Sequence, residues 1–243
     1  MRLSHLIPLA LVVFVSACSK ESDSEGKDKV NNQPISKYWL NPDLDYGKVK
    51  DANGYEYATI KIGHSEWMAE NLRSIKYCNG DDIHHGNDPE EWFFLNKGAY
   101  TYYDRDLVNE KIYGKMYNWH AVNDERNICP CGWRVASIQD WDEMIDYLGG
   151  DSIAGGKLKS QGTNYWKAPN LDATNESGFS AVGGGILHGY STFEHLNETV
   201  FYWTADAPHD VIADIKIMWY DSPLIRDMIN NKNFGNYVRC IKD

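Results

Sequence analysis

Acidic residues occur in close pairs in the first half of the chain. The pairs are Asp81-Asp82, Glu90-Glu91, and Asp104 with Asp106. Cleavage of a glycosidic bond uses two carboxyl groups at a fixed distance in space, one of them as a proton donor. Neighbours in sequence rarely meet that requirement, and solvated loop acids are far more common than catalytic ones. We therefore expect these acids to lie in loops and to catalyse nothing.

Two histidines, His84 and His85, follow Asp81-Asp82 closely. Imidazole and carboxylate are ordinary metal ligands, so a cation site is one interpretation of this cluster, but a polar loop is the more common one. The chain contains no Gly-x-Ser-x-Gly, His-Glu-x-x-His, phosphate-loop or dinucleotide motif, and these motifs mark the common hydrolases, zinc proteases and nucleotide enzymes. We therefore predict no catalytic residue, no metal and no cofactor.

Cys18 directly follows Ser16-Ala17 and an apolar run over residues 6–15. With Arg2 ahead of the run, residues 1–17 have the organisation of a bacterial lipoprotein signal peptide. The run is too short to cross a bilayer, which takes about 20 residues. We expect cleavage before Cys18 and its acylation, palmitate included, which would anchor the mature chain to a membrane. A secretory signal with an unmodified Cys18 is the alternative.

Residues 18–46 are predicted to be a disordered tether. The stretch over residues 19–33 is rich in charge and contains almost nothing apolar, so burial would not offset the entropy lost on ordering it. Acidic residues this close to a lipidated cysteine resemble the surface-export signals of Bacteroidetes-type lipoproteins. We therefore expect an outer-membrane protein on the outward face of that membrane, with the periplasmic face as the alternative.

The chain is acidic, with a formal net charge of −11. Loss of residues 1–17 removes Arg2 and no acid, which makes the charge −12. Because affinity for phosphate groups comes largely from Lys and Arg, this balance argues against nucleic acid as a partner. It also argues against an electrostatic hold on anionic lipid. The lipid at Cys18 is thus the membrane attachment that we predict.

Four cysteines follow Cys18: Cys78, Cys129, Cys131 and Cys240. An even number in an oxidising compartment predicts two disulfide bonds. Cys129 and Cys131 flank a single proline, and a bridge between them would be strained, so each is expected to reach Cys78 or Cys240. Two pairings satisfy this condition. A zinc site at Cys129 and Cys131 is the alternative, but their spacing is shorter than zinc-binding cysteines use.

One domain is expected over residues 47–243, which contain no second low-complexity break and no fixed repeat. Asn53-Gly54 between extended runs at 48–50 and 55–62 predicts a β-hairpin. We also expect a helix over 112–122, strands over 132–135, 201–204, 215–220 and 237–241, and loops over 177–185 and 222–236. Together with the helix described next, these elements predict an α+β fold.

A capped amphipathic helix is predicted after Ser137. Asp140 follows three residues later, and Trp141, Ile145 and Leu148 recur at helical spacing. Gly149-Gly150 beyond them gives a helix stop. Trp141 lies on the apolar face of this helix, so we expect it in the core rather than in a binding site.

Seven short motifs follow one another along the domain. They are Asp-Ala-Asn-Gly-Tyr-Glu-Tyr at 51–57, Ile-Lys-Ile-Gly at 60–63, Trp-Met-Ala-Glu-Asn-Leu at 67–72, Tyr-Asn-Trp at 117–119, Cys-Pro-Cys-Gly-Trp-Arg-Val at 129–135, Ala-Thr-Asn-Glu-Ser-Gly-Phe-Ser-Ala at 173–181 and Val-Arg-Cys-Ile-Lys-Asp at 238–243. In this order they resemble the signature of the Fibrobacter succinogenes major paralogous domain family. The resemblance covers nearly all of residues 47–243. It implies an exported lipoprotein that serves in surface attachment or glycan contact.

The resemblance also implies a C-type-lectin-like fold, with short twisted antiparallel strands, one or two helices and long loops, similar to the formylglycine-generating (sulfatase-modifying) group. The family pattern has one cysteine before Pro-x-Gly-Trp and another in the final Val-Arg-Cys, which implies a Cys129–Cys240 disulfide and leaves Cys78–Cys131 as the second. The chain departs from both groups in its chemistry. It lacks a matching pair of reactive thiols, and residues 203–206 are the only trace of a calcium-lectin motif.

On such a scaffold the long loops beside the later strands form the ligand face. The residues that this analogy places there are His188, Tyr190, Asp206, His209, Asp210, Trp219 and Asp221. Trp92, in the aromatic run at 92–94, is a further candidate if that run is exposed, and burial of the run is an equal alternative. We expect a non-catalytic module for adhesion that binds a glycan or a surface protein. The alternatives are an enzyme of the sulfatase-modifying or glycan-processing type and a subunit of a surface assembly such as a pilus tip.

Overall fold

The described region contains the predicted β-hairpin near its start. A computed structural model of the chain describes residues 38–189 and 192–243, which belong to one compact unit. Strand β1 (Gly47–Lys50) pairs antiparallel with β2 (Glu56–Ile62), and Gly54 has a φ of 85° in the turn. The Asp51 carboxylate accepts the N–H group of Tyr55 at 2.9 Å. The Asn-Gly turn signal predicted this element correctly.

Residues 38–46 pack against the domain, although we assigned them to the tether. Trp39 is 4% exposed, and its ring meets Tyr165 edge to face with centroids 5.2 Å apart. Burial of an indole ring is a large apolar contribution that the charged stretch before it lacks. Trp39 therefore does not belong to the predicted tether. The predicted signal peptide, Cys18 and the rest of the predicted tether lie outside the described residues.

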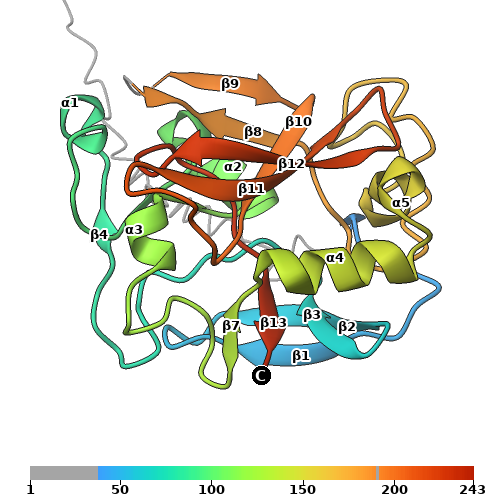
Figure 1. Ribbon diagram of the computed structural model, residues 1–243, viewed down its shortest axis with the longest axis horizontal. Coiled ribbons are helices and arrows are strands. Elements are labelled where there is room, and N and C mark those ends of the chain that lie inside the picture. The colour runs from blue at the N-terminus through green and yellow to red at the C-terminus, as the bar shows by residue number, and fades with distance from the viewer. Residues whose placement is uncertain (1–37, 190–191) are drawn as a thin grey trace, which may run out of the picture. The chain divides into compact units, whose positions relative to one another are not determined.

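The first five-stranded sheet has the order β1-β2-β3-β13-β7 (Figure 1). Its other strands are β3 (Ser65–Met68), β7 (Trp133–Val135) and β13 (Cys240–Lys242). β13 pairs antiparallel with both neighbours, and Ile241 lies opposite Trp67 and Arg134. The strand predicted over 132–135 is confirmed, whereas the one predicted over 237–241 is shorter and begins later. Segments far apart in sequence thus meet in the middle of this sheet.

Two disulfide bonds join the described cysteines. Cys129–Cys240 links residues 111 apart in sequence, with Cα atoms 5.9 Å apart. Cys78–Cys131 links residues 53 apart, with Cα atoms 5.3 Å apart. The first is the pairing that the family resemblance implied, and the second is the pairing of the two cysteines that remained. By the chain-entropy account, closing a loop as long as the first contributes about 4 to 5 kcal/mol to stability.

The second five-stranded sheet has the order β12-β11-β10-β8-β9. Its strands are β8 (Gly184–Leu187), β9 (Phe193–Leu196), β10 (Thr199–Trp203), β11 (Ile212–Trp219) and β12 (Ile225–Asn231). β10 and β11 confirm the strands predicted over 201–204 and 215–220. β12 lies in the predicted loop over 222–236, so that prediction was wrong. Its polar composition suits an exposed edge strand, and continuous pairing with β11 forms it despite low β-propensity.

A small third sheet has the order β4 (His84–His85), β5 (Ala99–Thr101), β6 (Met116–Tyr117). The single helix predicted over 112–122 is wrong. Helix α2 (Leu107–Tyr113) ends at Gly114, and α3 (Trp119–Val122) begins after β6 with an Asn118 cap. Gly114 has a φ of 83°, and a Cβ there would lie 2.9 Å from the Asn71 side chain, so the backbone requires glycine at this break.

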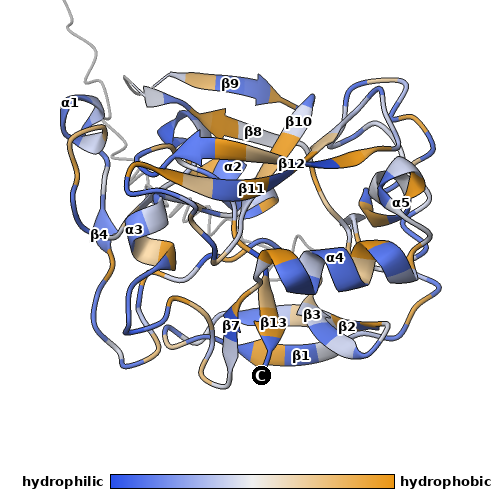
Figure 2. Ribbon diagram, viewed as in Figure 1, coloured by the Kyte–Doolittle hydropathy of each residue, from blue (hydrophilic) through white to orange (hydrophobic). Residues whose placement is uncertain are grey.

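Helix α4 (Ile138–Tyr147) packs between the two larger sheets (Figure 1). The Ser137 hydroxyl accepts the N–H of Asp140, and the Asp140 carboxylate accepts the N–H of Ser137, which forms a capping box. Trp141 is fully buried, with ring centroids 5.2 Å from a tryptophan of β3 and 5.4 Å from a tyrosine of β10. Figure 2 shows hydrophilic and hydrophobic colours alternating along this helix. The predicted amphipathic helix is confirmed, with Trp141 in the core.

Three further helical segments lie in the described part of the chain: α1 (Pro89–Trp92), the 3₁₀ helix η2 (Tyr103–Arg105) and α5 (Asp151–Leu158). The described chain has more helices than the one or two expected, although most are short. Helices combined with mainly antiparallel sheets confirm the α+β class. No helix within residues 38–189 and 192–243 combines the length and the apolar composition that crossing a bilayer requires.

Candidate functional site

The residues predicted to bind a ligand do not form one site. Asp206, His209 and Asp210 precede β11, whereas Trp219 and Asp221 lie at its far end. An eight-residue strand holds its ends about 23 Å apart. His188 directly follows β8, in another part of the sheet. One small ligand therefore cannot contact all of these residues.

Asp206 has a structural role at the start of α4. Its Oδ2 accepts the N–H of Ile138 at 2.6 Å, which satisfies one of the donors that a helix N-terminus leaves unpaired. Trp219 is half-buried, and its carbonyl oxygen accepts a hydrogen bond from Lys159 Nζ at 2.9 Å. The remaining predicted residues beside β11, which are His209, Asp210 and Asp221, are exposed.

Trp92 is buried, so of the two alternatives for this residue the structure has the buried one, and Trp92 is not an exposed ligand-binding candidate. Its side chain is 0% exposed, and its indole N–H donates to the carbonyl oxygen of Asn233 at 2.8 Å. The Asp88 cap and Pro89 start the short helix α1, which carries Trp92 on its inner side. Phe94 is 77% exposed, so the aromatic run is divided between core and surface. Tyr190 lies outside the described residues.

A polar groove of about 780 Å³ lies beside β4 and α3. We call it the polar groove, and its lining consists mostly of amide, carboxylate, imidazole and cationic side chains. The residues are Tyr77, Asp82, His84, Asn96, Lys97, Gly98, His120, Asn123, Asp124, Glu125 and Arg126. Asp82 and His84 were considered only as part of an acid pair or a cation site, and the other residues were not considered at all, because they come from separate segments that only the fold brings together.

The wall of the polar groove is fixed by a disulfide bond and an ion-pair cluster. The Cys78–Cys131 bond joins two of its loops, and the N–H of Cys78 donates to the carbonyl oxygen of Asn127 at 2.7 Å. The Arg126 guanidinium lies 4.0 Å from the centre of the Tyr77 ring and pairs with Asp124 at 2.7 Å. The guanidinium therefore has little freedom to reorient.

The charge states of Asp124 and Tyr77 in the polar groove suit hydrogen bonding to a ligand. The hydrogen bonds from Arg126 lower the pKa of Asp124 below its ordinary value. Burial, with the Asp124 carboxylate nearby, raises the pKa of Tyr77 to about 12. At neutral pH the groove thus presents an ionised carboxylate and a protonated phenol. A glycosidase acid needs the opposite shift, a raised carboxyl pKa.

Three polar side chains at the polar groove have hydrogen-bonding groups that no other described residue uses. Asn96, Asn123 and Glu125 are exposed, and none of the three makes a side-chain hydrogen bond to any described residue. An amide offers donors and an acceptor, and a carboxylate offers acceptors only. A few polar groups of this kind on a rigid wall are what orients a small ligand in a pocket.

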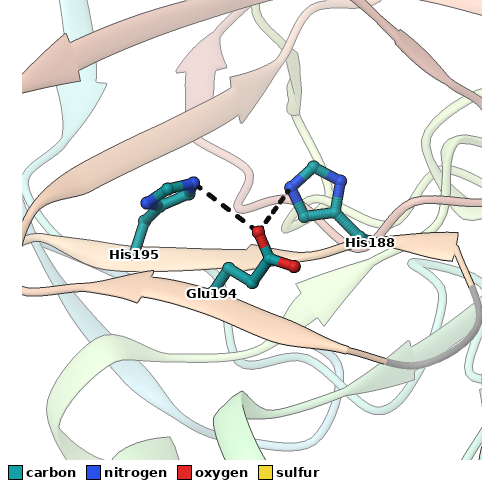
Figure 3. A group of neighbouring side chains, drawn as sticks. All are labelled: His188, Glu194 and His195. Atoms are coloured by element: carbon teal, nitrogen blue, oxygen red, sulfur yellow. Dashed lines mark ion pairs between the residues drawn. The ribbon is translucent and has the colours of Figure 1, made fainter.

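A histidine cluster lies on the β8–β9 hairpin (Figure 3). His188 Nε2 and His195 Nε2 lie 3.6 and 3.7 Å from the same atom, Glu194 Oε2. His195 Nδ1 lies 3.4 Å from Glu198 Oε2. Sequence reasoning named His188 alone. Glu194 and His195 could have been found by recognising that residues 184–187 and 193–196 form a hairpin, because its second strand places them opposite the residues just before His188.

A second groove, of about 650 Å³, runs beside α4 and is acidic. Its acidic lining residues are Asp142, Glu143, Asp146, Asp206 and Asp214. Burial raises the pKa of Asp214, and the carboxylates of Asp206 and Asp227 add to the effect. A carboxyl group shifted in this direction is better suited to act as a general acid than Asp124. If the protein is an enzyme, Asp214 is therefore the carboxyl group in these two grooves with the pKa shift that a general acid needs.

The described region corresponds to one known sequence family. A family model described as the Fibrobacter succinogenes major domain matches residues 60–242, which include four cysteines, both grooves and the histidine cluster. No curated protein and no solved structure matches the chain, so the likeness to C-type lectins stays a prediction. The motifs noted in the sequence agree with the match. The chain belongs to the Fibrobacter succinogenes major domain family.

Proposed function

We propose that the chain is a lipid-anchored module of the outward face of the outer membrane, which binds a glycan without altering it. The observation that carries this proposal is the polar groove, with amides and a carboxylate that the protein itself does not use. Sugar hydroxyl groups both donate and accept hydrogen bonds, so they complement such a mixture. The Cys78–Cys131 bond supports the proposal because it holds the wall in place without a bound ligand.

The predicted anchor adds to this function. A single open groove gives weak binding, but many copies tethered to one membrane engage a polymeric glycan together. Binding by one copy then raises the effective concentration of the next. Weak individual sites are therefore compatible with firm adhesion.

The test is a glycan array followed by calorimetric titration of the best glycan into the full chain. We expect reversible binding to wild type and no change in the recovered sugar. Asn96→Ala combined with Asn123→Ala removes hydrogen bonds worth about 1 kcal/mol each, and should weaken binding by about 30-fold. Asn164→Ala, at an exposed asparagine outside the groove, is the matched control and should bind as wild type does.

Two results would contradict the proposal. Release of a shortened sugar would make the protein an enzyme. Equal binding by the control and the double variant would place the glycan elsewhere on the chain.

A second candidate function is a subunit of a surface assembly. β12 is an edge strand, and no strand of the described residues pairs with its outer side. Met228 and Ile229, near its middle, are 48% and 52% exposed. An exposed apolar edge is a template for pairing with another chain. This edge supports assembly by strand addition as the alternative to glycan binding.

A further inference from the structure

The ligand atoms of the histidine cluster have a spacing that a hydrogen bond does not explain. His188 Nε2 and His195 Nε2 lie 3.6 and 3.7 Å from Glu194 Oε2, which is longer than a hydrogen bond of about 2.9 Å. Four-coordinate zinc, with bonds of about 2.0 to 2.1 Å, separates neighbouring ligand atoms by about 3.3 Å. Each of the three residues offers a ligand atom within 4.8 Å of those of the other two. The two nitrogen-to-oxygen distances are thus close to the edges of a coordination tetrahedron.

The backbone is distorted where it brings Glu194 and His195 to the same ligand position. Consecutive residues of a regular strand point to opposite faces of the sheet. His195, however, has a φ of 64°, in the left-handed region that few residues other than glycine adopt, and Gly185 on the adjoining strand has a φ of 70°. Figure 3 shows the Glu194 carboxylate between the rings of His195 and His188. Strained backbone of this kind is concentrated at functional sites.

The two rings are held by neighbouring side chains. The Glu198 carboxylate lies 3.4 Å from His195 Nδ1, and Lys167 Nζ donates to the same carboxylate at 2.8 Å. A carboxylate at Nδ1 holds the proton there and leaves the Nε2 lone pair for a metal, as in the outer sphere of many zinc sites. The His188 ring packs against Phe234 with centroids 5.0 Å apart.

We propose that His188, Glu194 and His195 bind one divalent transition-metal ion, with zinc as the ion that fits the donors best. Two imidazole nitrogens and one carboxylate oxygen are a recurrent zinc donor set. The three side chains are 33%, 48% and 45% exposed, so a fourth position is open to water or to a partner's ligand. This site is separate from the polar groove, and the proposal does not depend on glycan binding. The ion would link His188, which follows β8, to Glu194 and His195 on β9, and so would cross-link the end of the hairpin.

The test is calorimetric titration of Zn²⁺ into the full chain, purified without a histidine tag. We expect one ion per chain, and a higher melting temperature when zinc is present, because the folded hairpin binds it. Glu198→Gln should weaken binding by about tenfold, as loss of an outer-sphere partner does. His188→Ala and His195→Ala should weaken it further. Co²⁺ in place of zinc should give the visible absorption of a four-coordinate site in wild type but not in His188→Ala or His195→Ala.

His84→Ala is the matched control. His84 Nε2 also faces a carboxylate, that of Glu91 at 3.4 Å, but no second imidazole completes that pair in the described chain. The control should bind zinc as wild type does. Glu194→Gln keeps the size of the side chain, and near-UV circular dichroism would show that it folds normally. Equal loss in His84→Ala and His188→Ala, or unchanged affinity in a folded Glu194→Gln protein, would overturn the proposal.

Discussion

Lys159 is fully buried and holds three segments together. Its ammonium group donates to the carbonyl oxygens of Leu171, Trp219 and Ser222 at 3.0, 2.9 and 2.9 Å. Burial lowers its pKa to about 8, and attraction to Asp172 and Asp221 opposes that shift. Asp221, predicted from the sequence to bind a ligand, therefore contributes to the electrostatics of a structural lysine. A buried cation with this many partners strongly constrains the loop before β12.

Lys159 should make stability rise with pH above neutrality. The folded chain releases this proton near pH 8, whereas the unfolded chain keeps it to about pH 10.4, so the unfolded state binds more protons between these values. The free energy of unfolding of wild type should increase across that window, by about 3 kcal/mol at most, relative to Lys159→Met. Urea denaturation at pH 7, 8, 9 and 10 measures the difference. A constant difference between the two proteins would contradict the lowered pKa.

Residue types predicted the disulfide bonds better than the binding surface. Cysteines in an exported chain have few possible partners, so Cys129 and Cys240 could be identified from the family pattern. Asn96 and Asn123 could not be identified in this way, because exposed amides occur throughout any surface. The predicted set is scattered over the fold for a related reason: Asp206, for example, accepts a hydrogen bond at the start of a helix. Only packing distinguishes these roles.

At the scale of elements, the sequence predicted correctly those elements whose turn or cap residues lie within or next to them. The β1–β2 hairpin and helix α4 have their turn and cap residues within a few positions, so both were predicted correctly. β12 and β6 were missed because their partners, not their own residues, make them strands. The same dependence explains why the helix expected over 112–122 divides around β6.

The exposed edge of β12 gives a test of assembly. Ile229→Lys places a charge on the edge strand, which should suppress edge-to-edge pairing and reduce any self-association of the chain. Val108→Lys is the control, because Val108 is 60% exposed on α2 and lies on no strand. Light scattering at increasing concentration measures the effect. If both variants associate as wild type does, assembly does not proceed through β12.

At the scale of the whole molecule, the predicted lipid would fix the membrane at which the proposed binding surface acts. Cys18→Ser removes the site of acylation, so we expect the variant to leave the membrane fraction entirely and appear as soluble protein. Metabolic labelling with palmitate should mark wild type and not the variant. Protease treatment of intact cells should degrade wild type if it faces outward. A variant that still sediments with membranes would show that another part of the chain attaches it.

The position of β13 has a consequence for the order in which the protein folds. Its neighbours, β3 and β7, are translated long before it, yet they do not pair with each other. The first sheet therefore stays in two pieces until Cys240–Lys242 has been synthesised and, in an exported chain, carried across the membrane. Non-local closure of this kind is slow. A chain without β13 therefore lacks a complete first sheet, and the Cys129–Cys240 bond can form only once this last strand has reached the loop before β7.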